Sequence, residues 1–290
     1  MPPDALLPVA AAGSWPHDVL WGGLMQTLYQ VLYLAGPFFL VGLLLHKLEA
    51  ASQGRLAARF GWKSVLWTGW LGTPIHELSH AVLCLVFRHR IQRVAFFEPD
   101  AASGRLGYVS HSFDSKSVYQ VVGNFFIGVA PFVGGALALF GLLWLFEPAA
   151  AREALNADGI AGTAASGNLV EAAVQIARHA WDVLARVLSL DRLATVPFWA
   201  FLYLVLCIGS HLAPSPADYK GAWAGGLLLL GLLLLFNVLH LAVGGRPGMV
   251  TGVLAATLAP VLGLLVLAAV LSALTAPAVF AVTGAFRKRR

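Results

Sequence analysis

Long apolar runs alternate with short polar segments along the whole chain. Each run has about 18 residues or more, enough for a helix to cross about 30 Å of hydrocarbon. We therefore predict an all-α polytopic membrane protein with about six transmembrane helices. The expected spans are about Val19–Leu45, Val65–Phe87, Val118–Phe146, Val196–Leu212, Ala222–Val243 and Met249–Val282.

Two connecting segments differ from simple loops. Residues 90–112 carry β-branched and aromatic runs on either side of Ser103 and Gly104, which predicts a small β-hairpin. Pro148–Asp191 is rich in alanine, and we expect it to hold an amphipathic helix at about Leu169–Leu188, outside the membrane or along its surface.

The sequence shows no internal repeat, so one membrane domain is the simplest organisation. It divides into an N-terminal segment with the first span (1–64), a central core (65–221) and two further apolar segments with a basic C-terminus (222–290). The last apolar run contains Pro260 and Pro277. It is either one kinked helix or a helix followed by a re-entrant piece.

Composition and charge favour the membrane. Hydrophobic residues make up 59% of the chain and charged residues 11%, whereas soluble domains carry about 25% charged residues. The net charge is +5, and Arg287–Arg290 supply most of it. Basic residues in short loops and at a terminus indicate contact with an anionic membrane surface rather than with nucleic acid. We expect a multi-pass integral protein of the bacterial cytoplasmic membrane.

Cys84 and Cys207 lie within expected spans and are interpreted as small buried residues rather than as a disulfide.

The second expected span contains His76, Glu77 and, four residues after the first histidine, His80. On a helix, residues four apart share one face, so both imidazoles can bind one zinc ion. Glu77 then lies where it can act as general base toward water. The alternative is ordinary polar packing. Ionisable groups at membrane depth cost about 2.5–3.5 kcal/mol and usually mark function, which favours a shared metal.

A catalytic zinc ion needs a third protein ligand and keeps its fourth position for water. Asp218 is the candidate, because it borders an apolar span where Pro214 and Pro216 disfavour a continuous helix. We expect an extended or turn-like segment that aims its carboxylate at the metal. The alternative is a helix stop with Asp218 facing water. His211 is an alternative third ligand or a hydrogen-bonding partner of a ligand.

The third expected span is rich in glycine around and after Asn124. Small residues along one helix let neighbouring helices approach closely. Asn124 then either donates a hydrogen bond to a substrate carbonyl or joins two helices.

These features resemble the site-2 protease family of intramembrane zinc metalloproteases. That family has a three-helix core, with the HExxH motif on the first helix, a glycine- and asparagine-bearing stretch on the second and an aspartate ligand on the third. A β-hairpin follows the first helix. The resemblance covers about Val65–Gly221. It implies that His76, His80 and Asp218 bind zinc and that Glu77 is the base.

The chain departs from the family pattern at two places. In the third motif Asp218 comes one residue early, and His211 stands where the family has asparagine. If that segment were helical, one residue would rotate the carboxylate by about 100° from the family position. On the second helix Gly134 aligns with the family's asparagine, and Asn124 is its substitute. The resemblance therefore implies a divergent member.

The function that the resemblance implies is intramembrane endopeptidase activity on transmembrane protein substrates, as in regulated intramembrane proteolysis. A substrate segment would unwind and add as a strand to the hairpin edge at Tyr108 and Val109. Two other functions stay open. One is a membrane zinc hydrolase acting on a lipid or a small amide. The other is a non-catalytic metal-binding membrane protein or transporter.

Overall fold

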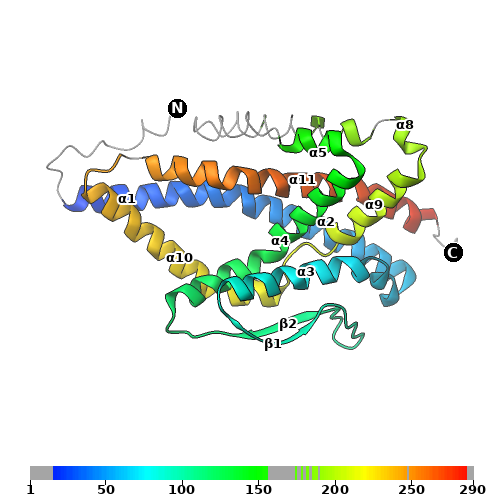
Figure 1. Ribbon diagram of the computed structural model, residues 1–290, viewed down its shortest axis with the longest axis horizontal. Helices are drawn as coiled ribbons and strands as arrows, with labels where there is room; N and C mark the ends of the chain where they lie inside the picture. Colours follow the sequence, from blue (N-terminus) through cyan, green and yellow to red (C-terminus); the bar gives the residue numbers. More distant parts are fainter. Residues whose placement is uncertain are drawn as a thin grey trace.

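The computed structural model describes residues 16–155, 174, 178, 181–182, 185–188, 190–246 and 248–285. Helices dominate, and the expected hairpin follows the helix that carries the histidine motif (Figure 1). The elements are α1 (Pro16–Gln30), a π-helical turn (Val31–Ala35), α2 (Gly36–Phe60), a 3₁₀ turn (Trp62–Val65), α3 (Leu66–Val86), β1 (Arg90–Ala95), β2 (Tyr108–Ser112), α4 (Val118–Phe146), α5 (Pro148–Leu155), α8 (Leu190–Leu193), α9 (Val196–Gly209), α10 (Pro216–Ala242) and α11 (Met249–Ala285).

Three stretches of the described chain are long and apolar enough to cross a membrane: α4, α10 and Val261–Gly284 of α11. Helix α9 is apolar but shorter. These helices support a membrane protein, whereas the expected total of six spans is not confirmed. Polar residues of the histidine motif interrupt the apolar surface of α3, and the second half of α2 carries charges such as Lys47 and Glu49.

The expected boundaries differ from the observed ones at both ends of the chain. The first expected span, Val19–Leu45, is the N-terminal part of a longer helical stretch that continues from α1 through the π-helical turn to Phe60. The last apolar run is one helix that continues through Pro260 and Pro277, so the re-entrant alternative is wrong. The amphipathic helix expected at 169–188 lies largely outside the described residues.

The helices pack in pairs around α4. Helix α2 lies along α11, α1 packs against the C-terminal part of α10, and α3 lies beside α4 above the hairpin (Figure 1). The main apolar core joins Leu139 and Leu143 of α4 to Phe201 and Val205 of α9 and to Leu271 of α11. Leu71 and Ile75 of α3 pack against this core, which thereby fixes α3 relative to α4 and α9.

Close helix contacts depend on glycine, as the sequence predicts for α4. A Cβ atom at Gly128 would lie 2.7 Å from the carbonyl oxygen of Asp218 on α10, and one at Gly134 would clash with Ser79 on α3. On α3 itself, a Cβ at Gly72 would clash with the carbonyl oxygen of Cys207. A larger side chain at any of these positions would push apart the helices that carry the candidate site.

A buried polar network ties the two ends of the chain together. The amide nitrogen of Asn237 on α10 donates to Thr27 Oγ1 at 2.8 Å and to Gln30 Oε1 at 2.7 Å, both on α1. The amide nitrogen of Gln30 donates to Thr251 Oγ1 on α11 at 3.1 Å. Hydrogen bonds of this kind hold helices together where apolar contacts alone give little specificity.

The hairpin is an antiparallel pair of strands with Val94 opposite Val109 and Ala95 opposite Tyr108. Its connecting loop turns at Gly104, whose φ of 71° is in the left-handed region that glycine adopts without strain. The predicted turn is therefore at the expected residue. Within the described chain the sheet has two strands.

Candidate metal centre

Both motif histidines point from one face of α3, and a main-chain oxygen holds each ring. His76 Nδ1 donates to the carbonyl oxygen of His211 at 2.8 Å, and His80 Nδ1 donates to that of Ile127 at 2.8 Å. A carbonyl oxygen only accepts, so each Nδ1 carries the proton. In the neutral imidazole each Nε2 therefore has a free lone pair.

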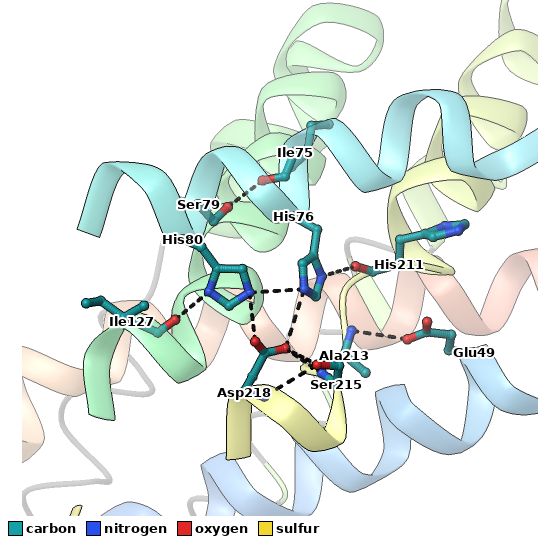
Figure 2. Close-up of polar contacts among 10 residues, drawn as sticks. All are labelled: Glu49, Ile75, His76, Ser79, His80, Ile127, His211, Ala213, Ser215 and Asp218. Atoms are coloured by element: carbon teal, nitrogen blue, oxygen red, sulfur yellow. Dashed lines mark hydrogen bonds and ion pairs between the residues drawn. The ribbon is translucent and has the colours of Figure 1, made fainter. Parts of the chain in front are cut away.

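Asp218 completes the cluster from the start of α10. The Nε2 atoms of the two histidines lie 3.2 Å apart. Asp218 Oδ1 lies 3.2 Å from His80 Nε2, and Oδ2 lies 3.7 Å from His76 Nε2 (Figure 2). The structure thus brings His76, His80 and Asp218 together as a possible metal-binding group.

The spacing of the three ligand atoms fits a four-coordinate metal ion. Bonds of about 2.1 Å in a tetrahedron separate ligand atoms by about 3.4 Å, and the observed separations scatter around that value. The side chains of His76, His80 and Asp218 are 13%, 7% and 18% exposed. Two lone pairs and a carboxylate that converge away from water require a cation between them. That cation is a metal ion or, in the competing arrangement, a single proton.

The conformation at Asp218 differs from the expected one. Ser215 is the N-cap of α10, Pro216 is its first residue, and Asp218 occupies the third helical position. The carboxylate accepts hydrogen bonds from the N–H and the Oγ of Ser215, both at 2.7 Å, in a capping box. The expectation of an extended or turn-like segment at Asp218 is wrong. Proline breaks the chain before the helix but is favoured as its first residue.

The helical conformation of Asp218 does not turn its carboxylate away from the two histidines. Position three of a helix leaves the carboxylate at the N-terminal end, where the helix dipole favours a negative charge. From there Oδ2 accepts the hydrogen bonds of Ser215, the N-cap residue, and both carboxylate oxygens face the histidine rings (Figure 2).

His211 contributes its main chain to the cluster. Its imidazole points away from His76 and His80 (Figure 2), and its Nδ1 lies 3.2 Å from the carbonyl oxygen of Cys207. The His211 side chain is therefore outside the ligand group that the structure brings together.

Glu77 is buried on α3, beside the two histidines and under the hairpin loop. A Cβ atom at Gly107 would lie 2.9 Å from Glu77 Cγ and 2.9 Å from Thr73 Cγ2. Only glycine lets the loop lie this close to the carboxylate. The backbone that leads into β2 thus passes directly over Glu77.

The three expected substrate-binding residues lie on two elements next to the cluster. Asn124 is buried in α4, one turn before Ile127. Tyr108 and Val109 are half-buried in β2. The guanidinium of Arg105 lies 4.4 Å from the centre of the Tyr108 ring. Substrate binding by these residues stays a prediction.

The sequence alone did not indicate two features near the cluster. Glu49 Oε2 accepts a hydrogen bond at 3.1 Å from the N–H of Ala213, and so fixes the segment between α9 and α10. Cys84, His89 and His111 form a second possible metal-binding group. The pKa of His111 is below its ordinary value, because burial and the neighbouring His89 disfavour the imidazolium. The only signals in the sequence were an acid just beyond an apolar run and a cysteine five residues before a histidine.

In comparisons with protein-family models, curated proteins and solved structures, none matches this chain.

Proposed function

We propose that this protein is an intramembrane zinc metalloendopeptidase, similar to the site-2 protease family, that hydrolyses peptide bonds in or near transmembrane helices. One observation carries the proposal. The Nε2 lone pairs of His76 and His80 and the carboxylate of Asp218 converge within 3.7 Å of one another, next to helices apolar enough to enter a membrane.

The donor set suits zinc. Two imidazoles and one carboxylate are the protein ligands of many catalytic zinc sites, and three protein ligands leave one position open. Each histidine donates its other N–H to a main-chain oxygen, which fixes the ring as metal-bound histidines require. Zinc bound there supplies a Lewis acid that polarises a carbonyl oxygen and makes water more acidic.

Glu77 is the proposed general base. It follows His76 directly on α3, and its burial shields the carboxylate from bulk water. In the proposed reaction Glu77 takes a proton from the attacking water and delivers it to the departing amine nitrogen. The water oxygen first bonds to the carbonyl carbon, and the peptide C–N bond then breaks as the amine nitrogen receives that proton.

The position of the hairpin favours a peptide over a lipid as the substrate. Its loop passes over Glu77 at Gly107, so an extended segment paired with the adjoining strand would run close to the base. Strand addition binds a substrate peptide through main-chain hydrogen bonds, which a lipid cannot supply. In this proposal β2 aligns the substrate at Tyr108 and Val109, and Asn124 holds the scissile carbonyl. The bacterial cytoplasmic membrane is the proposed location.

The test compares the zinc content of purified wild-type protein with that of His76→Ala. The variant should contain about one zinc ion per chain less, because it loses a ligand of the three-ligand site. His240→Ala is the matched control, since His240 lies at the far end of α10. Equal zinc content in His76→Ala and wild type would contradict the proposal.

A second comparison distinguishes the rival functions. Wild-type protein in proteoliposomes is supplied with a transmembrane peptide and with lipids. Cleavage of the peptide supports the endopeptidase. Cleavage of lipid with the peptide intact would indicate a lipid hydrolase, and zinc uptake without hydrolysis would indicate a transporter.

A further inference from the structure

Helix α3 ends in a reversal that folds His89 back over the last turn. The N–H of His89 donates to the carbonyl oxygen of Cys84 at 2.8 Å, and the N–H of Arg88 donates to that of Leu85 at 3.1 Å. These two bonds form a Schellman motif. Its left-handed position holds Arg88, with φ 58°, where glycine is usual. Among the described residues other than glycine, Arg88 alone has a positive φ.

This reversal helps to assemble three metal-ligating side chains. The ligand atoms of Cys84, His89 and His111 all lie within 4.8 Å of one another. Strand pairing supplies the third member, because β2 places His111 opposite Ile91 on β1. Cys84 is 0% exposed and His89 is 4% exposed. The cluster therefore joins the end of α3 to the second strand, with Cys84 and His89 buried and His111 half-buried.

Hydrogen bonding fixes the protonation of one ring. His89 Nε2 donates to the carbonyl oxygen of Gln120 on α4 at 2.9 Å, so in the neutral ring Nδ1 has the lone pair. That Nδ1 atom lies 3.0 Å from His111 Nδ1. The ring of Phe113 stacks on His89 with its centre 5.3 Å away, which further restricts the imidazole. In metal-bound histidines one ring nitrogen donates to an oxygen such as a carbonyl, and the other binds the metal. The His89 ring has this arrangement, since its second nitrogen faces the other candidate ligands.

We propose that Cys84, His89 and His111 form a second metal site, which binds a thiophilic d¹⁰ ion, zinc or copper(I), through one thiolate and two imidazoles. Sulfur and imidazole are the ligands that these two ions prefer. The bound ion releases the thiol proton of Cys84 to water. The competing arrangement is a simple hydrogen bond from His111 to His89, with Cys84 merely packed beside them.

The second site would act on the hairpin rather than on catalysis directly. Its ligands come from α3, from the turn after α3 and from β2, and Gln120 connects it to α4. A metal ion there would lock β2 to the end of α3. Cys84 lies four residues beyond His80, so both sites use one face of α3, about 6 Å of helix rise apart. The ligand sets do not overlap.

Cobalt substitution tests this site separately from the proposed protease site. A cobalt(II) ion bound to thiolate shows a sulfur-to-metal charge-transfer band in the near ultraviolet, whereas a site made of two histidines and an aspartate contains no sulfur. The chain has two cysteines. Wild-type protein loaded with cobalt should show the band, Cys84→Ser should lose it, and the matched control Cys207→Ser should keep it. Loss of the band in Cys207→Ser instead of Cys84→Ser would overturn the assignment.

A double variant keeps the test independent of the protease proposal. His76→Ala with His80→Ala removes two ligands of the first site but should retain the band. Metal analysis of the double variant as purified, before cobalt loading, should show about one zinc or copper ion per chain. Copper in place of zinc would assign the site to copper(I). If the wild type binds metal without any charge-transfer band, the second site is absent and the first stands. A charge-transfer band in the wild type, together with equal metal content in wild type and His76→Ala, would support the second site and contradict the first.

If Cys84→Ser fails to fold, His111→Asn provides the second variant. His111 is half-buried, and asparagine keeps a polar side chain at that position. The band should weaken or shift, because one nitrogen ligand changes while the thiolate remains. An unchanged spectrum in His111→Asn would show that His111 is not a ligand.

Discussion

His76 Nδ1 donates a hydrogen bond to the main-chain oxygen of His211 at 2.8 Å. The contact explains why a histidine seven residues before Asp218 lies near the cluster without using its imidazole there. The carbonyl orients the His76 ring and directs Nε2 toward Asp218. Replacing the side chain of His211 leaves that carbonyl in place, whereas replacing Asp218 removes a ligand atom.

The ranking of zinc loss follows from this contact. Asp218→Ala should weaken zinc binding about as much as His80→Ala does, by more than about 100-fold, since outer partners alone change affinity by about 10–100-fold. His211→Ala should weaken it much less. Zinc affinity measured by competition with a chelator checks the order. A larger effect at His211 than at Asp218 would transfer the third-ligand role to His211.

The cap of α10 provides a finer prediction. Ser215 Oγ donates to Asp218 Oδ2 at 2.7 Å and helps to hold the carboxylate toward the histidines. Ser215→Ala should lower zinc affinity by about 10-fold, the lower end for the loss of a ligand's hydrogen-bonding partner. Thr195→Ala is the control, because Thr195 is the N-cap of α9 and makes no side-chain cap bond. Equal affinities for the two variants would contradict a positioning role for Ser215.

Strand addition predicts sensitivity of the hairpin to proline. Val109→Pro removes one main-chain N–H from β2 and disturbs its pairing with β1. Cleavage of a transmembrane peptide should fall at least about 10-fold, the effect of losing roughly one main-chain hydrogen bond to substrate, while zinc bound at His76 and His80 is retained. Val109→Ala keeps the N–H and is the matched control. Proline and alanine variants that cleave at the same rate would argue against docking at this strand.

The buried amide network predicts a stability effect without a change in catalysis. Asn237→Leu leaves Thr27 and Gln30 without their shared donor. Unfolding in detergent should show a loss of about 1 kcal/mol or somewhat more. Thr257→Val on α11 is the control, since that hydroxyl bonds only within its own helix. If the two variants are equally stable, the network contributes nothing to helix association.

The sequence predicts a mainly helical chain and the hairpin, because each follows from a local pattern. Apolar length indicates the helices, and the glycine between two β-branched runs indicates the turn at Gly104. The number of spans is harder to predict, since the polar residues of the histidine motif lower the hydropathy of α3.

At the site, spacing alone is enough to pair His76 with His80. The expectation of an extended segment at Asp218 is wrong because proline breaks a helix interior but is favoured as its first residue. Ser215, Pro216 and Asp218 are also the N-cap, first and third residues typical of a helix start, a signal present in the sequence. The grouping of Cys84 with His111 could not be predicted, because it depends on strand register and on a left-handed turn at a non-glycine residue.

The central claim is that Glu77 performs catalysis beside a metal that it does not bind. The most direct measurement is cleavage of a transmembrane peptide in proteoliposomes by wild type and Glu77→Gln, with zinc content determined on the same samples. We predict that the variant keeps its zinc and loses at least about 100-fold in rate, because general-base catalysis contributes about 10²–10⁴-fold. A Glu77→Gln variant that holds zinc and cleaves at the wild-type rate would contradict the account.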